Sequence, residues 1–338
     1  MSVLHALQTR AAPFVALRRD LHRHPELGLH EFRTSQVLAE QLESWGYTVT
    51  RGLATTGLVA QLKRGNGGKR LGLRADMDAL PIHETNNFEH CSVHAGVMHA
   101  CGHDGHTAML MAAAQYIAQE VEFSGTLNLI FQPAEEHPGG AQIMIKEGLF
   151  ERFPCDAIFA AHNMPGVAAG ELVFIEGPAM ASSDDVTITL TGVGGHGAMP
   201  HRAQDPIVAA AAIVMTLQTI VSRNVDPQHT AVITVGSLVA GKANNVIPAS
   251  ARLELSVRSL DREVRDLLQE RITQLVTAQA QSLGVLAHID YKRDYPVLVN
   301  TAAETELARQ VGTELLGAER VTRQGRPLTG SEDFAVML

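Results

Sequence analysis

Apolar and polar residues alternate with spacings that change along the chain, and the first half repeats a pattern of helices and strands. Residues 3–23 and 31–46 carry apolar residues at helical spacing, and the Pro and Gly of "HPELG" separate them. A third helical stretch, rich in Ala and Met, covers 106–120. Short apolar runs typical of buried strands occur at four places, each ending in polar residues: 56–65, 69–81, 126–132 and 155–163. This alternation predicts an α/β domain with a mostly parallel central sheet and helices on both faces.

The pattern changes near residue 183, where an alternation of period two begins in "DDVTITLTG". From there the spacing predicts a strand, a helix, two strands, a helix and a strand, at 184–192, 205–223, 229–238, 251–258, 261–283 and 286–292. The order β-α-β-β-α-β is that of the ferredoxin-like α+β unit. We therefore expect a catalytic domain formed by residues 1–182 and 296–338, with residues 183–295 inserted into it as a second domain.

Composition indicates a globular protein and argues against several other classes. Of the 338 residues, 45% are hydrophobic and 19% are charged, which is typical of a globular protein. The formal net charge of −9 argues against a nucleic-acid partner. The N-terminal segment lacks the apolar core of a signal peptide, and the sequence shows no run of roughly 18 apolar residues that would span a membrane. The three cysteines, an odd number in a long chain, indicate reduced thiols and a cytoplasmic protein.

The stretch "MHACGHDGH" at 98–106 concentrates side chains that bind metals. Cys101 lies next to the expected start of a helix, where exposed amides favour the thiolate. Thiolate and neutral imidazole are good ligands for Zn²⁺ and similar ions, which makes Cys101 and His103 candidate ligands. The alternative is a histidine-rich surface loop with a free cysteine. Six histidines within 83–106, together with the acidic residues at neighbouring strand ends, favour a metal site.

Polar residues follow the other expected strands of the first half. Glu135 and Glu136 come directly after a buried strand, and adjacent residues of an extended segment point in different directions. One carboxylate could then bind a metal while the other acts as a general base, which is the division of labour in metal-assisted hydrolysis. His162 ends another strand, and Asp76 and Asp78 follow a third, where either could orient a ligand. The alternatives are solvated loop carboxylates and a histidine bonded to backbone. Because ligands bind beyond the carboxyl ends of parallel strands, we expect these residues to face one site.

Several motifs together resemble one family: "LHRHPELGLHEFRTS", "LRADMDALP", "MHACGHDGHTAML", "QPAEEHPGGA", "HNMPG", "GVGGHGAMPH", "NNVIP" and "GSEDFA". The chain is similar, over nearly its whole length, to the amidohydrolase branch of the metallopeptidases that includes aminoacylases, hippurate hydrolase and indole-acetyl-amino-acid hydrolases. The resemblance implies a hydrolase that cleaves N-acyl amino acids with two divalent ions, of Zn, Mn, Co or Ni. It implies four metal ligands: Cys101, which bridges the ions, His103, Glu136 and His162. It also implies that Glu135 is the general base and that Asp78 contacts and orients a metal ligand. Asp76 stands where other branches of the family have a histidine ligand.

The resemblance assigns further roles to the inserted domain. It implies a lid that also forms a homodimer, and a His196 that stabilises the oxyanion of the tetrahedral intermediate, reaching the active site of the partner subunit. By the same likeness Asn245 contacts the substrate, and Arg258 pairs with the substrate carboxylate through its planar guanidinium. Taken without the resemblance, His196 is a turn residue and Arg258 a surface residue at a strand end.

Two competing functions remain from the sequence: a dipeptidase or aminopeptidase of similar architecture, and a non-catalytic binding protein that retains the fold. A peptidase needs an acidic partner for the free amine of its substrate, and we identify none. Loss of Glu135 or Glu136 would favour the binding protein, and both are present. In the family several dozen residues follow "SEDFA" and supply one more histidine ligand. We therefore expect the polypeptide to continue past Leu338.

Overall fold

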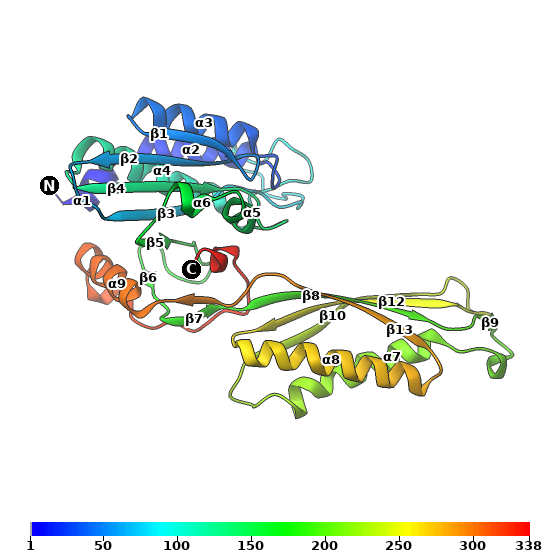
Figure 1. The fold of residues 1–338 in the computed structure, drawn as a ribbon. Coiled ribbons are helices and arrows are strands. Elements are labelled where there is room, and N and C mark those ends of the chain that lie inside the picture. Colours follow the sequence, from blue (N-terminus) through cyan, green and yellow to red (C-terminus); the bar gives the residue numbers. More distant parts are fainter. Residues whose placement is uncertain (1) are drawn as a thin grey trace. The chain divides into compact units, whose positions relative to one another are not determined.

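Five strands form the central sheet of the first part of the chain in the computed structural model, which describes residues 2–338 (Figure 1). Their order across the sheet is β1 (Thr48–Leu53), β2 (Gly57–Arg64), β4 (Gly125–Gln132), β3 (Arg70–Asp76) and β5 (Ala157–Ala160). Strand β3 pairs in parallel with both β4 and β5, whereas the pairings of β2 with β1 and β4 are antiparallel. All strands except β2 therefore run in one direction, which confirms the mostly parallel sheet.

Helices cover both faces of this sheet. On one face α2 (Ala11–Arg23), α3 (Phe32–Ser44) and α4 (His103–Glu120) pack on the strands and enclose an apolar core that includes Leu38, Met111 and Leu129. Ile130 alternates with Leu129 along β4, so it points to the opposite face, where it is equally buried. There α5 (Gly140–Lys146) contacts β4 and the short helix α6 (Leu149–Arg152). The expected helix over 3–23 is interrupted at Arg10, which ends α1 (Val3–Thr9) and precedes α2.

A four-stranded antiparallel sheet forms the second part of the chain. Its elements follow in the order β8 (Ser182–Thr191), α7 (Pro206–Arg223), β10 (Ala231–Ala240), β12 (Ser250–Ser259), α8 (Arg262–Ser282) and β13 (Leu286–Arg293). The strands lie in the order β10-β12-β8-β13, and the two helices pack on one face, as the β-α-β-β-α-β pattern predicted. Ile188, Ile213, Leu253 and Leu268 form the centre of its core, each at most 1% exposed.

Contacts divide the chain into two units, which we call the first and the second unit. The first consists of the residues up to Phe174, Glu306–Arg323 and Val336–Leu338, and the second of Ile175–Thr305 and Gln324–Ala335. The second unit is thus larger than the expected insert 183–295, because flanking segments pair with each other. The elements that flank the two units are β6 (Leu172–Val173), β7 (Gly177–Met180), β14 (Leu298–Asn300), α9 (Ala302–Leu316) and β15 (Val321–Thr322), with β7 paired to β14 and β6 to β15.

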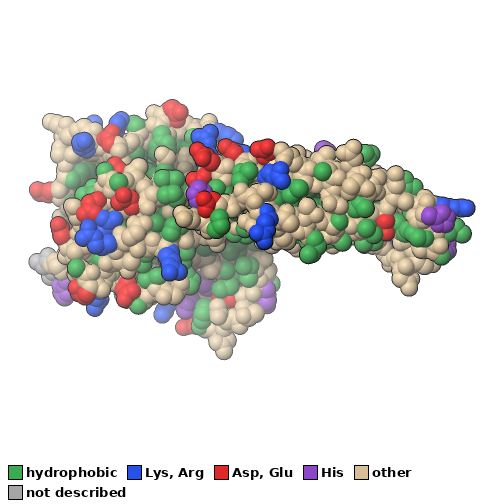
Figure 2. Space-filling model, turned by 90° about the horizontal axis from the view of Figure 1, so that it is seen from below, with side chains coloured by type: hydrophobic (Ala, Val, Ile, Leu, Met, Phe, Trp, Pro, Cys, Tyr) green, Lys and Arg blue, Asp and Glu red, His purple; other side chains and the backbone are tan. Residues whose placement is uncertain are grey.

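Short elements complete the described part of the chain: β9 (Gly195–His196), η1 (Pro200–Arg202), β11 (Val246–Ile247), η2 (Ala318–Arg320) and η3 (Asp333–Val336), where η denotes a 3-10 helix. The cysteines Cys91, Cys101 and Cys155 are all free thiols. On the face that Figure 2 shows, acidic and basic side chains are interspersed with one another and with hydrophobic ones.

Helix α7 is long and apolar enough to cross a membrane, by length and composition alone. Among the described residues it is the one helix that meets this criterion, with 18 residues. Its face formed by Ala209, Ile213 and Leu217 is nevertheless buried in the core of the second unit. Packing against the antiparallel sheet thus accounts for the buried third of α7, whereas Val208 and Met215 on its other side are exposed.

Candidate metal centre

Side chains from two strand ends and one helix start meet in the first unit. Ligand atoms of Cys101, His103 and His162 lie within 4.8 Å of one another, and those of His103, Glu135 and Glu136 do so as well. His103 is the first residue of α4, whereas His162 follows β5 and the two glutamates follow β4. The structure therefore brings together all four proposed ligands and the proposed base at the carboxyl ends of parallel strands, where such sheets bind ligands.

The orientation of His103 fits a metal ligand. Its Nδ1 lies 3.0 Å from Oδ1 of Asp78, and both side chains are buried. Its Nε2 is also buried, and no hydrogen-bond partner for it exists among the described residues. A histidine that ligates a metal usually donates its other ring N–H to a carboxylate, so Nε2, which lies 3.8 Å from Oδ2 of Asp76, is the atom that would bind the ion. These donors suit Zn²⁺ and its neighbours in the first transition series.

Asp78 connects two of the proposed ligands. While Oδ1 contacts His103, Oδ2 accepts a hydrogen bond from the backbone N–H of Glu136 at 2.9 Å. His162 is oriented by its own neighbour, because its Nδ1 lies 2.5 Å from the carbonyl oxygen of Asn163 and Nε2 faces Cys101 Sγ at 3.5 Å. Backbone and carboxylate contacts of this kind aim ligand atoms before an ion binds.

The two glutamates lie in a tight turn, which differs from the expected extended segment. Residues 135–138 form the turn, Ala134 before it has a φ of +53°, and the peptide bond between His137 and Pro138 is cis. Glu135 is buried, at 6% exposed, and Glu136 is half-buried. The turn, and not strand alternation, therefore sets how the two carboxylates lie, and an oxygen of each is within 4.8 Å of the other and of a ring nitrogen of His103.

The charges of the site shift several pKa values. Burial by itself lowers the pKa of His103, but the charge of Asp76 and the hydrogen bond with Asp78 outweigh burial and raise this pKa to about 12. Burial raises the pKa of Glu136, although the charge of His103 acts to lower it. Burial also raises the pKa of the Cys101 thiol, so the expected thiolate is wrong for the site without an ion. A bound cation would displace these protons, since metals bind deprotonated ligands.

His106 is a residue of the site that the sequence analysis did not single out. Its Nδ1 lies 2.6 Å from Oδ1 of Asp76, and its Nε2 accepts the backbone N–H of Asn163 at 2.9 Å. Because Nε2 must be an acceptor there, Nδ1 carries the proton that bonds Asp76. Asp76 also accepts a bond from Arg74 Nη1 at 2.7 Å. The hydrogen bonds from Asp76 through His106 fix the backbone of Asn163, the residue next to His162. In the sequence, the spacing of three between His103 and His106 indicates that both lie on one face of a helix, and this spacing could have identified His106.

Gly102 joins two proposed ligands in a conformation that excludes other residues. It has a φ of +93°, and a Cβ atom there would lie 2.4 Å from Oδ1 of Asn163. We predict that Gly102→Ala lowers the free energy of unfolding by about 1–2 kcal/mol through backbone strain. By displacing Asn163 it should also weaken metal binding by roughly tenfold or more. Chemical denaturation and titration with Zn²⁺ measure the two effects.

Gly96→Ala is the matched control for this prediction. Gly96 has a φ of +81°, and its Cβ would meet nothing within 4 Å. It should therefore show the same loss of stability with normal metal affinity. Equal metal affinities in the two variants would mean that Asn163 has no part in arranging the site.

The three remaining predicted residues belong to the second unit and lie at two separate places in it. Val246 of β11, which follows Asn245, pairs with His196 of β9, and the carbonyl oxygen of Asn245 accepts the N–H of Gly197 at 2.8 Å. Both residues lie beyond the Ser250 end of β12, where Figure 1 shows β9. Arg258 lies at the other end of β12, roughly 26 Å away along the strand, and its Nη1 donates to Oγ of Ser331 at 2.8 Å. The structure brings His196 and Asn245 together and leaves Arg258 apart from them.

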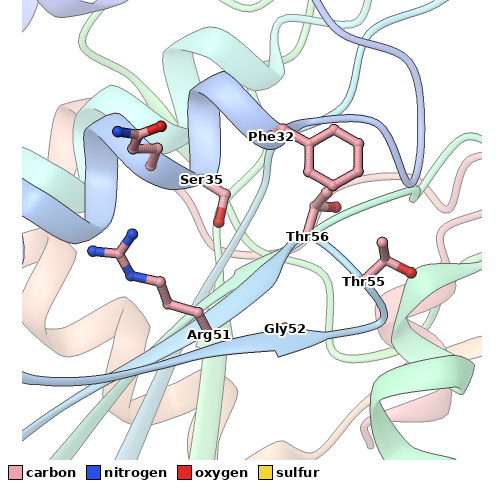
Figure 3. A pocket seen from close by; sticks show the side chains of 7 residues that line it. Phe32, Ser35, Arg51, Gly52, Thr55 and Thr56 are labelled. Carbon is pink, nitrogen blue, oxygen red and sulfur yellow. The ribbon is translucent and has the colours of Figure 1, made fainter.

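The cavity in Figure 3 lies elsewhere in the first unit. It measures about 370 Å³, and polar residues from β1, α3 and the turn after β1 dominate its lining, among them Ser35, Arg51 and Thr56. None of the residues proposed for catalysis, metal binding or substrate binding lines it.

Comparison with known proteins decides the family. The model of peptidase family M20/M25/M40 matches residues 72–338, which includes the cluster of proposed ligands. The chain belongs to the M20/M25/M40 peptidase family. Among relatives in this family, the hippurate hydrolase of Campylobacter jejuni is 44% identical over 334 residues, which cover 99% of this chain and 87% of the relative. The N-acetyl-L-cysteine deacetylase of Bacillus subtilis is 36% identical, covering 98% of this chain and 79% of the relative.

A solved structure of the M20 family has the same fold. The YXEP protein of Bacillus subtilis, described as a dinuclear metal-binding peptidase of the M20 family, superimposes with a TM-score of 0.82 at 33% identity. The match covers 98% of this chain and 86% of that structure. The M20 family and this relative support divalent metal binding by the cluster around His103.

Proposed function

We propose that the protein is a metal-dependent amidohydrolase that cleaves N-acyl amino acids of the hippurate or N-acetyl type into a carboxylic acid and a free amino acid. The observation that carries this proposal is the buried Glu135 beside the ligand atoms of Cys101, His103, Glu136 and His162. Metal-assisted hydrolysis of an amide requires a general base next to the metal centre. Hydrolases of N-acyl amino acids recur among the relatives.

In this proposal two divalent ions per subunit, of Zn, Mn, Co or Ni, supply Lewis acidity toward the acyl carbonyl and toward water when bound. Cys101, His103, Glu136 and His162 would hold the ions. Glu135 accepts a proton from the attacking water and returns it to the leaving amine. Asp78 holds the Nδ1 proton of His103 and the backbone of Glu136. His196 stabilises the oxyanion, Asn245 contacts the substrate, and Arg258 pairs with its carboxylate.

A substrate panel tests this function against the peptidase alternative. Metal-reconstituted protein is assayed with acetyl-, benzoyl- and indole-acetyl-amino acids and with dipeptides that carry a free amine. Turnover of one or more acyl amino acids without turnover of dipeptides is the expected result. Preference for dipeptides would assign the protein to the peptidases of this architecture, and no turnover of either class would favour a binding protein.

The geometry of the second unit supports a homodimer through the inserted domain as part of the proposal. His196 and Arg258 lie at opposite ends of β12, at a separation far longer than an N-acyl amino acid. Both residues can therefore contact the same substrate molecule only when they come from different subunits. We retain the division into a catalytic domain, 1–182 with 296–338, and an inserted lid, 183–295, and we propose a cytoplasmic location.

Mixed dimers provide the sharpest test of this arrangement. Glu135→Gln and His196→Ala should each inactivate the homodimer. Refolding the two variants together in equal amounts should restore about a quarter of wild-type activity, because half of the dimers are mixed and each mixed dimer has one intact site of two. Each variant refolded alone is the control. A mixture that stays at the background of its components would mean that His196 acts within its own subunit.

A further inference from the structure

The segment "ELGLHE", residues 26–31, has no role in the function described so far, yet it contacts two loops of the metal centre. Toward the loop after β3, the carbonyl oxygen of Glu26 accepts the N–H of Ala79 at 2.8 Å, and Leu27 forms a parallel bridge to Ala79. Ala79 directly follows Asp78, which contacts His103. One end of this segment is thus attached to the loop that orients a proposed ligand.

The middle of the segment packs against the turn that carries Glu135. A Cβ atom at Gly28 would lie 2.2 Å from the carbonyl oxygen of His137 and 2.9 Å from Cβ of Ala134. Backbone and side-chain atoms of that turn therefore occupy the space next to Gly28, and only glycine permits this approach. The segment and the turn form one packed layer.

Glu31, at the end of the segment, makes the decisive contact. Its side chain is fully buried, and Oε1 accepts the backbone N–H of Ala134 at 2.9 Å. Oε2 lies 2.5 Å from Oγ1 of Thr56. Ala134 is in the left-handed region with a φ of +53°, which costs energy for a residue with a Cβ atom and persists only when its surroundings hold it. Ala134 is also the residue directly before Glu135.

We propose that Glu31 is a positioning residue for the reaction: through its hydrogen bond to Ala134 it holds the strained start of the turn and thereby aims the carboxylates of Glu135 and Glu136. This proposal rests on the proposed function for its effect on catalysis. Its effect on the turn depends only on the contacts of Glu31.

The protonation of Glu31 does not break its contacts. Burial raises the pKa of Glu31 to about 7, the charge of Asp78 acts in the same direction, and the bonds from Thr56 and Ala134 act against it. The groups that face the carboxyl from the elements packed on it are the neutral Thr56 hydroxyl and Ala134 amide and the charged Asp78. As a carboxylate it accepts from both neutral partners, and as an acid it donates from Oε2 to Thr56, which also lines the cavity of Figure 3.

These contacts define two variants with opposite outcomes. Glu31→Gln keeps both bonds, because its amide oxygen accepts from Ala134 and its amide nitrogen donates to Thr56. Glu31→Ala removes both. The control is Tyr47→Phe, which removes a buried hydrogen bond of the same unit, from Tyr47 to the carbonyl oxygen of Ala114 at 2.9 Å, away from the turn.

Hydrogen exchange of the metal-free protein is the first measurement. In Glu31→Ala the amides of residues 134–137 and 139 should exchange at least tenfold faster than in wild type, while Glu31→Gln and Tyr47→Phe stay within twofold. Steady-state kinetics of the metal-loaded protein is the second measurement. Glu31→Ala should lower kcat about tenfold or more with KM within threefold, since a small misplacement of a reacting group has large effects. Glu31→Gln should restore kcat to near the wild-type value.

Unchanged exchange of the amides of residues 134–137 and 139 in Glu31→Ala would overturn the proposal, as would a kcat no lower than that of Tyr47→Phe. Should Glu31→Ala fail to fold, Glu31→Asp replaces it: its carboxylate is one methylene shorter, cannot reach Ala134, and should give the same faster exchange. If wild-type protein turns over no acyl amino acid, the proposed function fails, while the exchange measurement still decides whether Glu31 holds the turn.

Discussion

Replacing Glu135 by Gln should leave the metal content unchanged and lower kcat by about 10²–10⁴-fold, the usual contribution of a general base. Gln has nearly the shape of Glu but cannot accept the proton of the attacking water. Glu135 is buried next to His103 and Glu136, so solvent cannot readily replace it as the base. Elemental analysis of the loaded protein and steady-state kinetics with an acyl amino acid measure the two quantities.

Glu136→Gln is the matched control, because the two residues are adjacent in one turn and have different proposed roles. As a ligand, Glu136 should lose metal along with activity when its charge is removed. If Glu135→Gln loses the metal while Glu136→Gln retains it, the roles of the two residues are exchanged. A Glu135→Gln protein with near-normal kcat would show that another group is the base.

The sequence predicted strands best where apolar and polar residues alternate regularly, because one face of the sheet is buried and the other is exposed. In β8 and β12 every second residue packs into the core of the second unit, and the expected strands agree with them within a few residues. Strand β1 was missed because it lies at the edge of its sheet and five of its six residues are exposed or half-buried, which leaves little alternation. Helix α4 begins at His103, three residues before the expected start, because Gly102 in its left-handed conformation forms the cap.

For the metal centre, the sequence predicted which strand ends converge but not how the side chains are held. Polar residues after buried strands indicate a site because parallel strands end at one edge of a sheet. The role of His106 depends on a backbone amide 57 positions away, at Asn163, and no local pattern reveals such a contact. The same holds for Glu31, whose partner Ala134 is 103 positions away. The pKa of Cys101 depends on burial, which the position next to a helix start does not indicate.

Removing the divalent ions should abolish turnover and reduce the free energy of unfolding. An ion that binds only the folded protein stabilises it by about 4 kcal/mol when its free concentration is roughly 1,000 times Kd. The ion-free centre is a good candidate for such an effect, because burial raises the pKa of Glu136 and the charge of Asp78 acts in the same direction, and a bound cation would offset both. Denaturation of chelated and reloaded protein at a fixed free metal concentration measures the difference.

Asp78→Asn separates a resident metal centre from a loosely bound ion. Asn cannot supply the carboxylate that bonds both His103 and the backbone of Glu136, and loss of such a partner weakens metal binding by about 10–100-fold. At the same free metal concentration, the stabilisation by metal should therefore be about 1.4–2.7 kcal/mol smaller in Asp78→Asn than in wild type. The comparison uses the metal-dependent increment within each protein, so a general loss of stability in the variant does not affect it. An equal increment in both proteins would mean that the ion binds away from His103. Full activity of the chelated wild type would exclude a metal-dependent reaction at this site.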